Sequence, residues 1–235
     1  MRPGNLTLNP SVPRGSILIL SAELKTILYA AVLSDVLDGL GYMNQAMRPF
    51  VRPLDETLVL MGRARTGSYA QTYSVEADEN PYELEMRLLD DLKPGEIPVL
   101  GCGGPTERIA PWGELLTTAT IARGGVGCVT DGLVRDVRMI RELQLPVFHG
   151  GIGPLDSRGR GRMVEMDRPV ECAGVTVRGG DVIFGDVDGV VVIPREIEDK
   201  VFAEALEKVK AENHTRDELR AGGYLADVYA KYGVL

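Results

Sequence analysis

The feature that most constrains the fold is a regular alternation of apolar and amphipathic segments in the middle of the chain. Three short apolar runs alternate with two segments whose apolar residues have helical spacing. The apolar runs are IPVLGCGG, GVGCVT and PVFHG, at 97–104, 125–130 and 146–150, and the helical segments are WGELLTTATIAR and RDVRMIREL, at 112–123 and 135–143. Strands that alternate with helices in this way form βαβ units with parallel strands and right-handed crossovers. The sequence therefore predicts an α/β fold.

Segments on both sides of this region complete the domain. Residues 175–194, VTVRGGDVIFGDVDGVVVIP, contain short apolar runs separated by Gly-Gly and Asp-Gly, which predicts antiparallel hairpins. Four further elements are expected: a helix over 21–41 with a break near Ser34, a strand over 57–68, a helix over 82–92, and a charged amphipathic outer helix over 195–213. We expect an irregular arm at 1–15, a single α/β domain at 16–222, and a tail at 223–235 that folds back or reaches a neighbouring subunit.

Composition narrows the classes of partner and compartment. The formal net charge of the 235-residue chain is -8, which disfavours nucleic acid as a partner, because phosphate binding needs a basic face. The three cysteines lack metal-type or disulfide-type spacing, which is typical of a reducing compartment. There is no apolar run of the roughly 18 residues that a membrane span requires. We therefore expect a soluble cytoplasmic protein that binds neither nucleic acid nor membrane.

Candidate site residues occur at two junctions where a strand leads into a helix. Ligands of α/β proteins bind at the carboxyl ends of parallel strands, beside helix N-termini. Glu114 follows one junction and Arg135 follows the next, 21 positions later, so both should lie at equivalent levels of consecutive units. Asp136 and Glu114 are hard oxygen ligands suited to Mg²⁺ or Mn²⁺, while Arg135 offers a planar fork for a carboxylate or keto oxygen. Backbone N–H groups over 113–116 would add an anion site, so the set suits a 2-oxo acid.

Each of these residues also has an ordinary structural interpretation. An Arg-Asp pair at a helix start usually complements the helix dipole, and the same holds for Glu114. His149 at a strand end is more often a satisfied edge residue than a base. Cys102 between glycines is more often a small buried residue than a nucleophile. Asp186 and Asp188 are first interpreted as residues of a hairpin turn.

A longer motif favours the functional interpretation. The stretch APWGELLTTATIARGGVGCVTDGLVRDVRMIRELQLPVF, at 110–148, resembles the family of 4-hydroxy-4-methyl-2-oxoglutarate aldolases and regulators of ribonuclease E activity, the RraA-like family. SDVLDGLG at 34–41 and CAGVTVRGGDVIFGDVDGVVVIP at 172–194 also fit, so the resemblance covers about 30–222. The specific part is an acidic residue, twenty intervening positions and then Arg-Asp, which Glu114, Arg135 and Asp136 match.

The resemblance implies a role for each matching residue. Asp136 would help to hold a divalent metal, Glu114 would organise metal-bound water, and Arg135 would contact the pyruvyl part of the substrate. The backbone amides of Leu115 and Leu116, next to Glu114, would receive the substrate carboxylate, and Gly113 would belong to the same substrate-binding turn. The implied architecture is a compact RraA-like α/β domain with a β-rich portion, assembled as homotrimers or homohexamers with sites at subunit interfaces.

The activity expected from this resemblance is that of a metal-dependent lyase. It would cleave the C–C bond next to a 2-oxo acid through a metal-stabilised enolate, by retro-aldol reaction or by decarboxylation of oxaloacetate, with release of pyruvate. The alternative is a non-catalytic protein-binding regulator that inhibits a ribonuclease. A methyltransferase is disfavoured, since no glycine-rich cofactor loop followed by a strand-end acid is present. The segment at 68–92 is longer and more acidic than expected for the aldolases, which leaves the distal half of the substrate open.

Overall fold

The computed structural model describes residues 17–234, with side chains from residue 22 onward, so the predicted arm at 1–15 lies outside the described residues. The helices are α1 Ile17–Ile27, α2 Ala30–Gly39, α3 Glu83–Asp90, α4 Glu114–Ala122, α5 Val137–Leu143, α6 Glu198–Arg220 and α7 Leu225–Tyr232. The strands are β1 Arg52–Pro53, β2 Leu60–Gln71, β3 Glu96–Gly101, β4 Cys128–Thr130, β5 Leu133–Val134, β6 Val147–His149, β7 Gly151–Ile152, β8 Gly161–Met166, β9 Val170–Cys172, β10 Val175–Val177, β11 Val182–Asp186 and β12 Gly189–Ile193.

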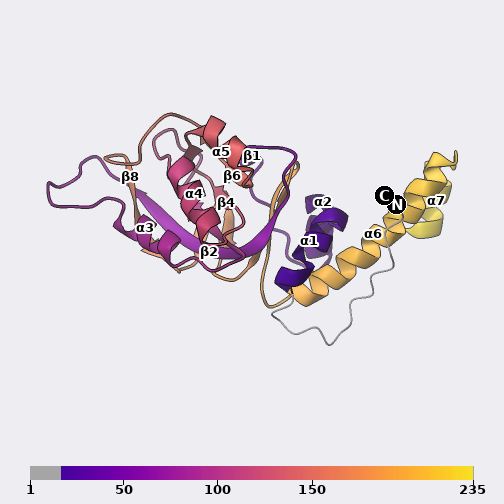
Figure 1. Cartoon of the computed structure of the whole chain (residues 1–235). Coiled ribbons are helices and arrows are strands. Elements are labelled where there is room, and N and C mark those ends of the chain that lie inside the picture. Colours follow the sequence, from indigo (N-terminus) through magenta and orange to yellow (C-terminus); the bar gives the residue numbers. More distant parts are fainter. Residues whose placement is uncertain (1–16, 235) are drawn as a thin grey trace.

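The middle of the chain forms the predicted parallel units. Strands β2, β3, β4 and β6 are neighbours in the main sheet, and each adjacent pair is parallel. Helix α4 connects β3 to β4, and α5 connects β4 to β6. These two helices lie side by side over the parallel part of the sheet, with α3 next to α4 (Figure 1). The α/β prediction is therefore confirmed, and both helix N-termini come at the carboxyl ends of parallel strands.

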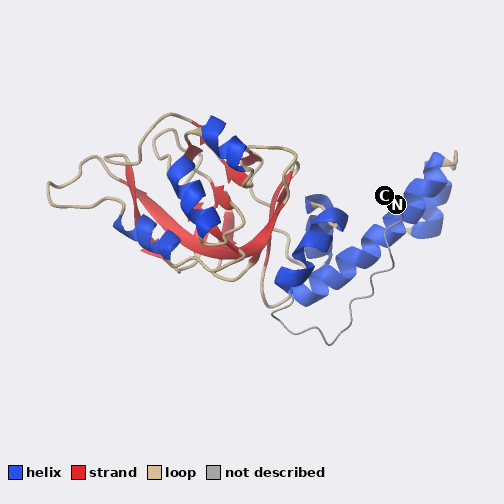
Figure 2. Ribbon diagram, viewed as in Figure 1, coloured by secondary structure: helices blue, strands red, loops and turns tan. Residues whose placement is uncertain are grey.

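Antiparallel strands extend the sheet until it nearly closes. β11 pairs with both β2 and β12, β8 pairs with the far half of β2, and β1 pairs with β6 at the opposite edge. The side chain of Arg52 in β1 donates to the carbonyl of Asp188 in the β11–β12 turn at 3.0 Å, which links the two edges. Figure 2 shows the resulting curved sheet in red, with helices beside it. The predicted hairpin is β11–β12, whereas β10 pairs with β9 in a separate small sheet.

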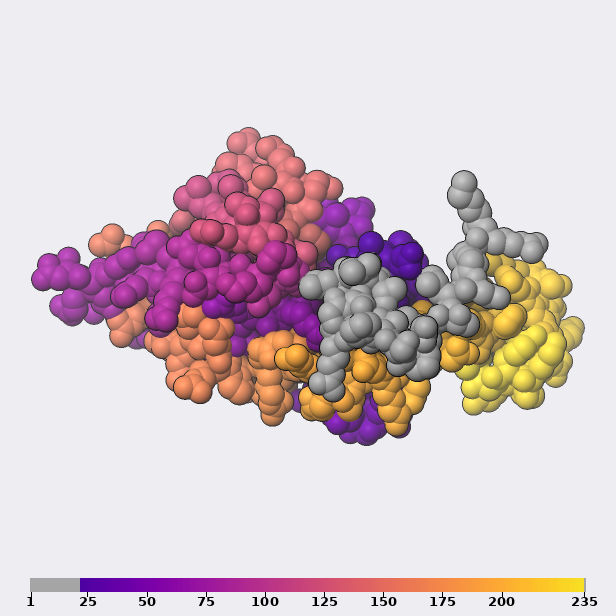
Figure 3. Space-filling model, turned by 60° about the horizontal axis from the view of Figure 1, so that its bottom comes forward, coloured from indigo at the N-terminus to yellow at the C-terminus, as the bar shows by residue number. Residues whose placement is uncertain are grey.

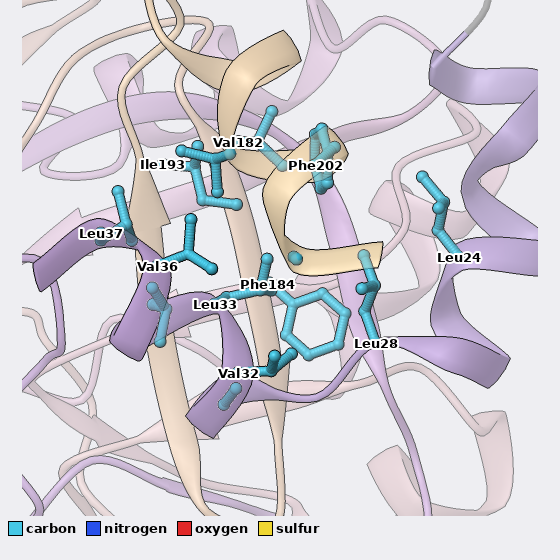
Figure 4. Close-up of a cluster of buried hydrophobic side chains, with 14 of the residues drawn as sticks. Leu24, Leu28, Val32, Leu33, Val36, Leu37, Val182, Phe184, Ile193 and Phe202 are labelled. Carbon is cyan, nitrogen blue, oxygen red and sulfur yellow. The ribbon is translucent and has the colours of Figure 1, made fainter. Parts of the chain in front are cut away.

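Helices α1 and α2 pack on the β11–β12 part of the sheet and bury an apolar cluster there (Figure 4). The predicted break in this helical segment was placed wrongly. Ser34 lies inside α2, and the break is at Tyr29, whose backbone is extended at φ -142° and ψ 157°. The carboxylate of Asp186 accepts a hydrogen bond from the Ala30 N–H at 2.7 Å, so the helix start is stabilised by a residue of the distant hairpin. No nearby residue could have indicated this.

The C-terminal helices form an arm that leaves the body of the protein. The first half of α6 packs on α2 through buried residues that include Val201, Phe202 and Leu206, and its second half extends away (Figures 1 and 3). α7 folds back on α6, with Val228 buried between them. Tyr224, Leu225 and Tyr229 remain exposed on this arm. None of the helices in the described residues is both long and apolar enough to span a membrane.

Candidate functional site

Two strand-to-helix junctions meet at the site, as the sequence predicts. The segment after β3 runs to Trp112 and α4, and the segment after β4 runs through β5 to Arg135 and α5. Trp112 forms an isolated parallel bridge with Val134, and the Arg135 N–H donates to the Trp112 carbonyl at 3.0 Å. The buried indole of Trp112 donates to the hydroxyl of Thr117 at 2.9 Å, which fixes the start of α4. The two junctions are therefore held together by backbone hydrogen bonds.

Gly113 lies where the two junctions approach each other closely. Asp136 lies at the start of α5 with a left-handed backbone, at φ 59°, and one of its carboxylate oxygens accepts the Glu114 N–H at 3.3 Å. A Cβ atom at Gly113 would lie 2.7 Å from that oxygen, Oδ2, and 3.2 Å from Cγ of Arg135. Only a residue without a side chain leaves this space free. The glycine thus allows Arg135 and Asp136 to lie against the N-terminus of α4.

Glu114 is close to this pair through its backbone, but its side chain has another partner. Its Oε1 accepts a hydrogen bond from the hydroxyl of Thr118, one helical turn along α4, at 2.7 Å. Leu115, next in the first turn, has a side chain that is 75% exposed. First-turn N–H groups have no partner within the helix, and in the described part of the chain those of Leu115 and Leu116 have no recorded acceptor. They are therefore free to bind an anion at the surface.

The Arg135 guanidinium lies between two carboxylates. Its Nε is 3.6 Å from Oδ2 of Asp136, and its Nη1 is 3.4 Å from Oδ2 of Asp156 in the loop between β7 and β8. The other oxygen of Asp156 accepts the hydroxyl hydrogen of Tyr82 at 2.9 Å. Neither Asp156 nor Tyr82 is indicated as a site residue by the sequence. No local pattern relates them to Arg135. The pairing of β5 with β7 brings the loop of Asp156 beside Arg135.

A buried carboxyl group lies behind this part of the site. Burial raises the pKa of Glu85 in α3 to about 7, although the hydrogen bond from the Tyr69 hydroxyl, at 2.6 Å, lowers it. The negative charge of Asp156 raises the pKa of Glu85 further and the positive charge of Arg135 lowers it. The protonation of Glu85 therefore depends on the charges of Asp156 and Arg135 at the surface. Its position within a helical segment with apolar periodicity gave no signal for this.

Two other candidate residues, Cys102 and His149, are buried, and Asp131 fixes the loop that contains Cys102. The buried carboxylate of Asp131 accepts the N–H groups of Cys102, Gly104 and Ala173, at 2.6, 2.9 and 3.2 Å, and so fixes the glycine loop after β3. Burial raises the pKa of the Cys102 thiol, which keeps it protonated and unsuited to nucleophilic attack. Burial lowers the pKa of His149, whose Nδ1 has no hydrogen-bond partner among the described residues. The burial and raised pKa of Cys102 confirm that it is a small buried residue, as expected.

The donor set fits a weakly held hard cation. Asp136 and Glu114 belong to one surface, and each carboxylate uses one oxygen in the hydrogen bonds described above and has a second oxygen available. Mg²⁺ characteristically binds through one or two carboxylates and keeps several waters. Within residues 17–234, no group of three or more His, Cys, Asp or Glu side chains is arranged to hold a metal. The described residues therefore contain no cage of three or more such ligands.

The site is open rather than enclosed. A cavity of about 260 Å³ occurs between the start of α3 and β8, lined by Glu79, Asn80, Pro81, Glu83, Leu84, Arg162, Met163 and Val164. None of the predicted site residues lines it. The side chains of Arg135 and Asp136 are 36% and 35% exposed. A ligand at this surface would therefore still be accessible to solvent in an isolated chain.

Comparison with known proteins places this geometry in context. A protein of Halalkalibacterium halodurans named "Putative 4-hydroxy-4-methyl-2-oxoglutarate aldolase" is 32% identical over 185 residues, which cover 79% of this chain and 81% of that protein. Protein DlpA of Legionella pneumophila is 27% identical over 86% of this chain, which spans only 32% of DlpA. The structure of Streptomyces coelicolor RraAS2, described as an unusual member of the RNase ES inhibitor RraA protein family, superposes with a TM-score of 0.75 at 24% identity, over 87% of this chain and 97% of that one. Residues 30–192, most of the α/β body that carries both junctions, match the family described as RraA-like, Aldolase/RraA, and the chain belongs to that family.

Proposed function

We propose that this protein is a divalent-metal-dependent lyase that cleaves the C–C bond next to a 2-oxo acid and releases pyruvate. The observation that carries the proposal is the position of Arg135 and Asp136 beside the N-terminus of α4. Gly113 has no side chain, and this leaves room for both residues there. A planar cationic donor, a carboxylate and a helix N-terminus on one exposed surface are the groups that a 2-oxo acid requires. The aldolase relative supports a lyase, since the two chains match over most of their lengths.

Each residue of the site would have a role in binding or catalysis that follows from its chemistry. The N–H groups of Leu115 and Leu116, at the positive end of the α4 dipole, would bind the substrate carboxylate. The guanidinium of Arg135 would donate to the keto oxygen, whose negative charge grows as the neighbouring C–C bond breaks. Asp136 and Glu114 would hold Mg²⁺ or Mn²⁺, which when bound supplies Lewis-acid polarisation of the substrate carbonyl. Both retro-aldol cleavage and decarboxylation place charge on this same oxygen, so one arrangement serves both reactions.

The second candidate function is inhibition of a ribonuclease by binding to it. The likeness to RraAS2 favours it, because that protein is described within a family of ribonuclease inhibitors. The net charge of -8 suits a basic partner surface, but it equally suits solubility. The lyase explains more of the site, since docking alone gives no reason for the clearance at Gly113.

The test is release of pyruvate from oxaloacetate, with and without EDTA, measured against metal alone and against heat-denatured protein. These blanks are needed because oxaloacetate also loses CO₂ without an enzyme. We expect release above both blanks that EDTA abolishes and added Mg²⁺ or Mn²⁺ restores. The exposed ion-pair residue Asp90, changed to Asn, provides a control substitution remote in sequence from the site. Release that never exceeds the blanks, together with inhibition of a ribonuclease, would instead support the regulator.

We also propose that the protein works as a homo-oligomer, a trimer or hexamer, with the site near a subunit boundary. Tyr224, Leu225 and Tyr229 are 81%, 55% and 49% exposed on the C-terminal arm, and Leu115 is exposed beside the site. Apolar side chains gathered on a projecting helix commonly mark a protein interface. Light scattering should give a multiple of 25.5 kDa at micromolar concentration. A mass near 25.5 kDa under those conditions would contradict this proposal.

A further inference from the structure

The contact between Arg135 and the loop after β7 points to a role for two residues outside the Glu114–Arg135–Asp136 motif. We propose that Asp156 and Tyr82 are positioning residues that hold the guanidinium of Arg135 in the orientation needed to bind substrate. The inference rests on the proposed function, because Arg135 must bind substrate for its orientation to matter. It adds two residues, one in the loop between β7 and β8 and one immediately before α3, to the machinery of the site.

The hydrogen bonds of Asp156 divide its two oxygens between different tasks. Oδ1 accepts the hydroxyl of Tyr82 at 2.9 Å and the N–H of Arg158 at 3.0 Å. Oδ2 faces Nη1 of Arg135 at 3.4 Å. The backbone carbonyl of Asp156 also accepts a hydrogen bond from the Arg160 guanidinium at 3.1 Å. Because one oxygen and the backbone are fixed, the second oxygen is presented to Arg135 in a defined direction.

Arg135 needs such a partner, because its side chain is 36% exposed and an arginine side chain loses much rotational freedom when it is held. Asp136 restrains the guanidinium at Nε, and Asp156 restrains it at Nη1. Two contacts at different nitrogens fix the plane of the group, whereas one contact would leave it free to rotate. Nη2 donates to no recorded acceptor in the part of the chain that the structure describes, which leaves this nitrogen for substrate.

Asp156 keeps its charge at neutral pH. Burial raises the pKa of its carboxyl group, but the hydrogen bonds from Arg158 and Tyr82 and the charge of Arg135 outweigh this, so the pKa lies below its ordinary value. The competing interpretation is that Tyr82 and Asp156 only attach the loop to the start of α3. That purely structural role would affect stability, but it would not act through Arg135.

The test combines substitutions at Asp156 and Tyr82 with a change at Arg135. Asp156→Asn removes the charge while keeping an oxygen for Tyr82, and Tyr82→Phe removes only the hydroxyl that fixes Asp156. Each is measured alone and together with Arg135→Lys, by kcat for pyruvate release, by melting temperature, and by the affinity for oxalate in calorimetry. Oxalate serves as a planar dianion that resembles the enolate of pyruvate. The matched controls are Asp90→Asn, in an exposed ion pair with Arg123, and Tyr73→Phe, whose side chain is exposed.

In the wild-type background we expect Asp156→Asn to lower kcat and oxalate affinity roughly tenfold, since small misplacements of catalytic groups have effects of this order. Tyr82→Phe should have a smaller effect in the same direction, and the two controls should match the wild type. In the Arg135→Lys background both effects should largely disappear, because residues that act through a third one are not additive with it. The same loss in both backgrounds, or no loss at all for either substitution, would overturn the inference. Absence of pyruvate release by the wild-type protein would instead refute the proposed function itself, and the positioning role with it.

Discussion

Replacement of Gly113 by alanine should damage the site while leaving the fold nearly intact. The backbone of Gly113 is extended, at φ -156° and ψ -171°, a conformation that alanine also adopts, so no backbone strain is introduced. The added Cβ would lie 2.7 Å from Oδ2 of Asp136. Carbon–oxygen contacts normally begin at about 3.3 Å, so this oxygen would have to move by about 0.6 Å. The group that would be displaced is therefore the Asp136 carboxylate, whose other oxygen is proposed to hold the metal.

The magnitude follows from how steeply rate depends on position. A misplacement of 1 Å can cost about a hundredfold in rate, so about 0.6 Å predicts a loss of about tenfold in kcat for Gly113→Ala. The stability cost at a helix start is below about 1 kcal/mol, or a fall in melting temperature of no more than about 3 °C. Pyruvate release and thermal unfolding are measured in parallel with Gly179→Ala, because a Cβ at Gly179 would meet nothing within 4 Å. A Gly113→Ala protein with kcat within about twofold of the wild type would refute the reasoning, since that rate would require an undisturbed carboxylate.

Three further substitutions test separate parts of the structure. Asp136→Ala should abolish metal-dependent pyruvate release with little change in melting temperature, and wild-type activity at limiting Mg²⁺ would show that the carboxylate serves only the helix start. Arg135→Lys should lower kcat and kcat/KM together by about a hundredfold or more, because lysine lacks the planar guanidinium group. A kcat within about twofold of the wild type would contradict a catalytic role for Arg135. Burial raises the pKa of Glu85 from its ordinary value of 4.5 to about 7, so its charged form destabilises the fold and the free energy of unfolding should fall as pH rises between these values. This fall in the free energy of unfolding amounts to about 3 kcal/mol, because each pKa unit corresponds to about 1.4 kcal/mol. Glu85→Gln should remove it. If denaturant unfolding curves of both proteins changed equally with pH, Glu85 would not be the group responsible.

The sequence predicts the parts of this structure that depend on local patterns. Apolar runs alternating with helical spacing were enough to indicate the parallel strands β3, β4 and β6 and their connecting helices. The rule that ligands bind at the carboxyl ends of strands then predicted that Arg135 and Asp136 lie near the start of α4. The structure places them there. These predictions succeeded because each depends on consecutive βα units, whose arrangement follows from their local patterns.

Features that depend on contacts between segments distant in the sequence could not be predicted in this way. Asp156 contacts Arg135 from another loop, Tyr82 contacts Asp156 from a third segment, and nothing in their own segments indicates these contacts. The break at Tyr29 was missed for the same reason, since the residue that stabilises the start of α2 belongs to the β11–β12 hairpin. The contact between Glu114 and Thr118 is different: their spacing of four within a predicted helix would have suggested it.

The hydrogen bond from Ala30 to Asp186 has a consequence for the order of folding. Its partners are 156 residues apart in the sequence, and the second oxygen of Asp186 accepts the N–H of Asp188 within the hairpin turn. A formed turn would orient the carboxylate to receive the first amide of α2. Contacts so distant in sequence require a large loop to close, which slows their formation. We expect the amides at the start of α2 to gain protection from hydrogen exchange later than those of β11 and β12 during refolding, so that the helical layer assembles on a sheet that already exists.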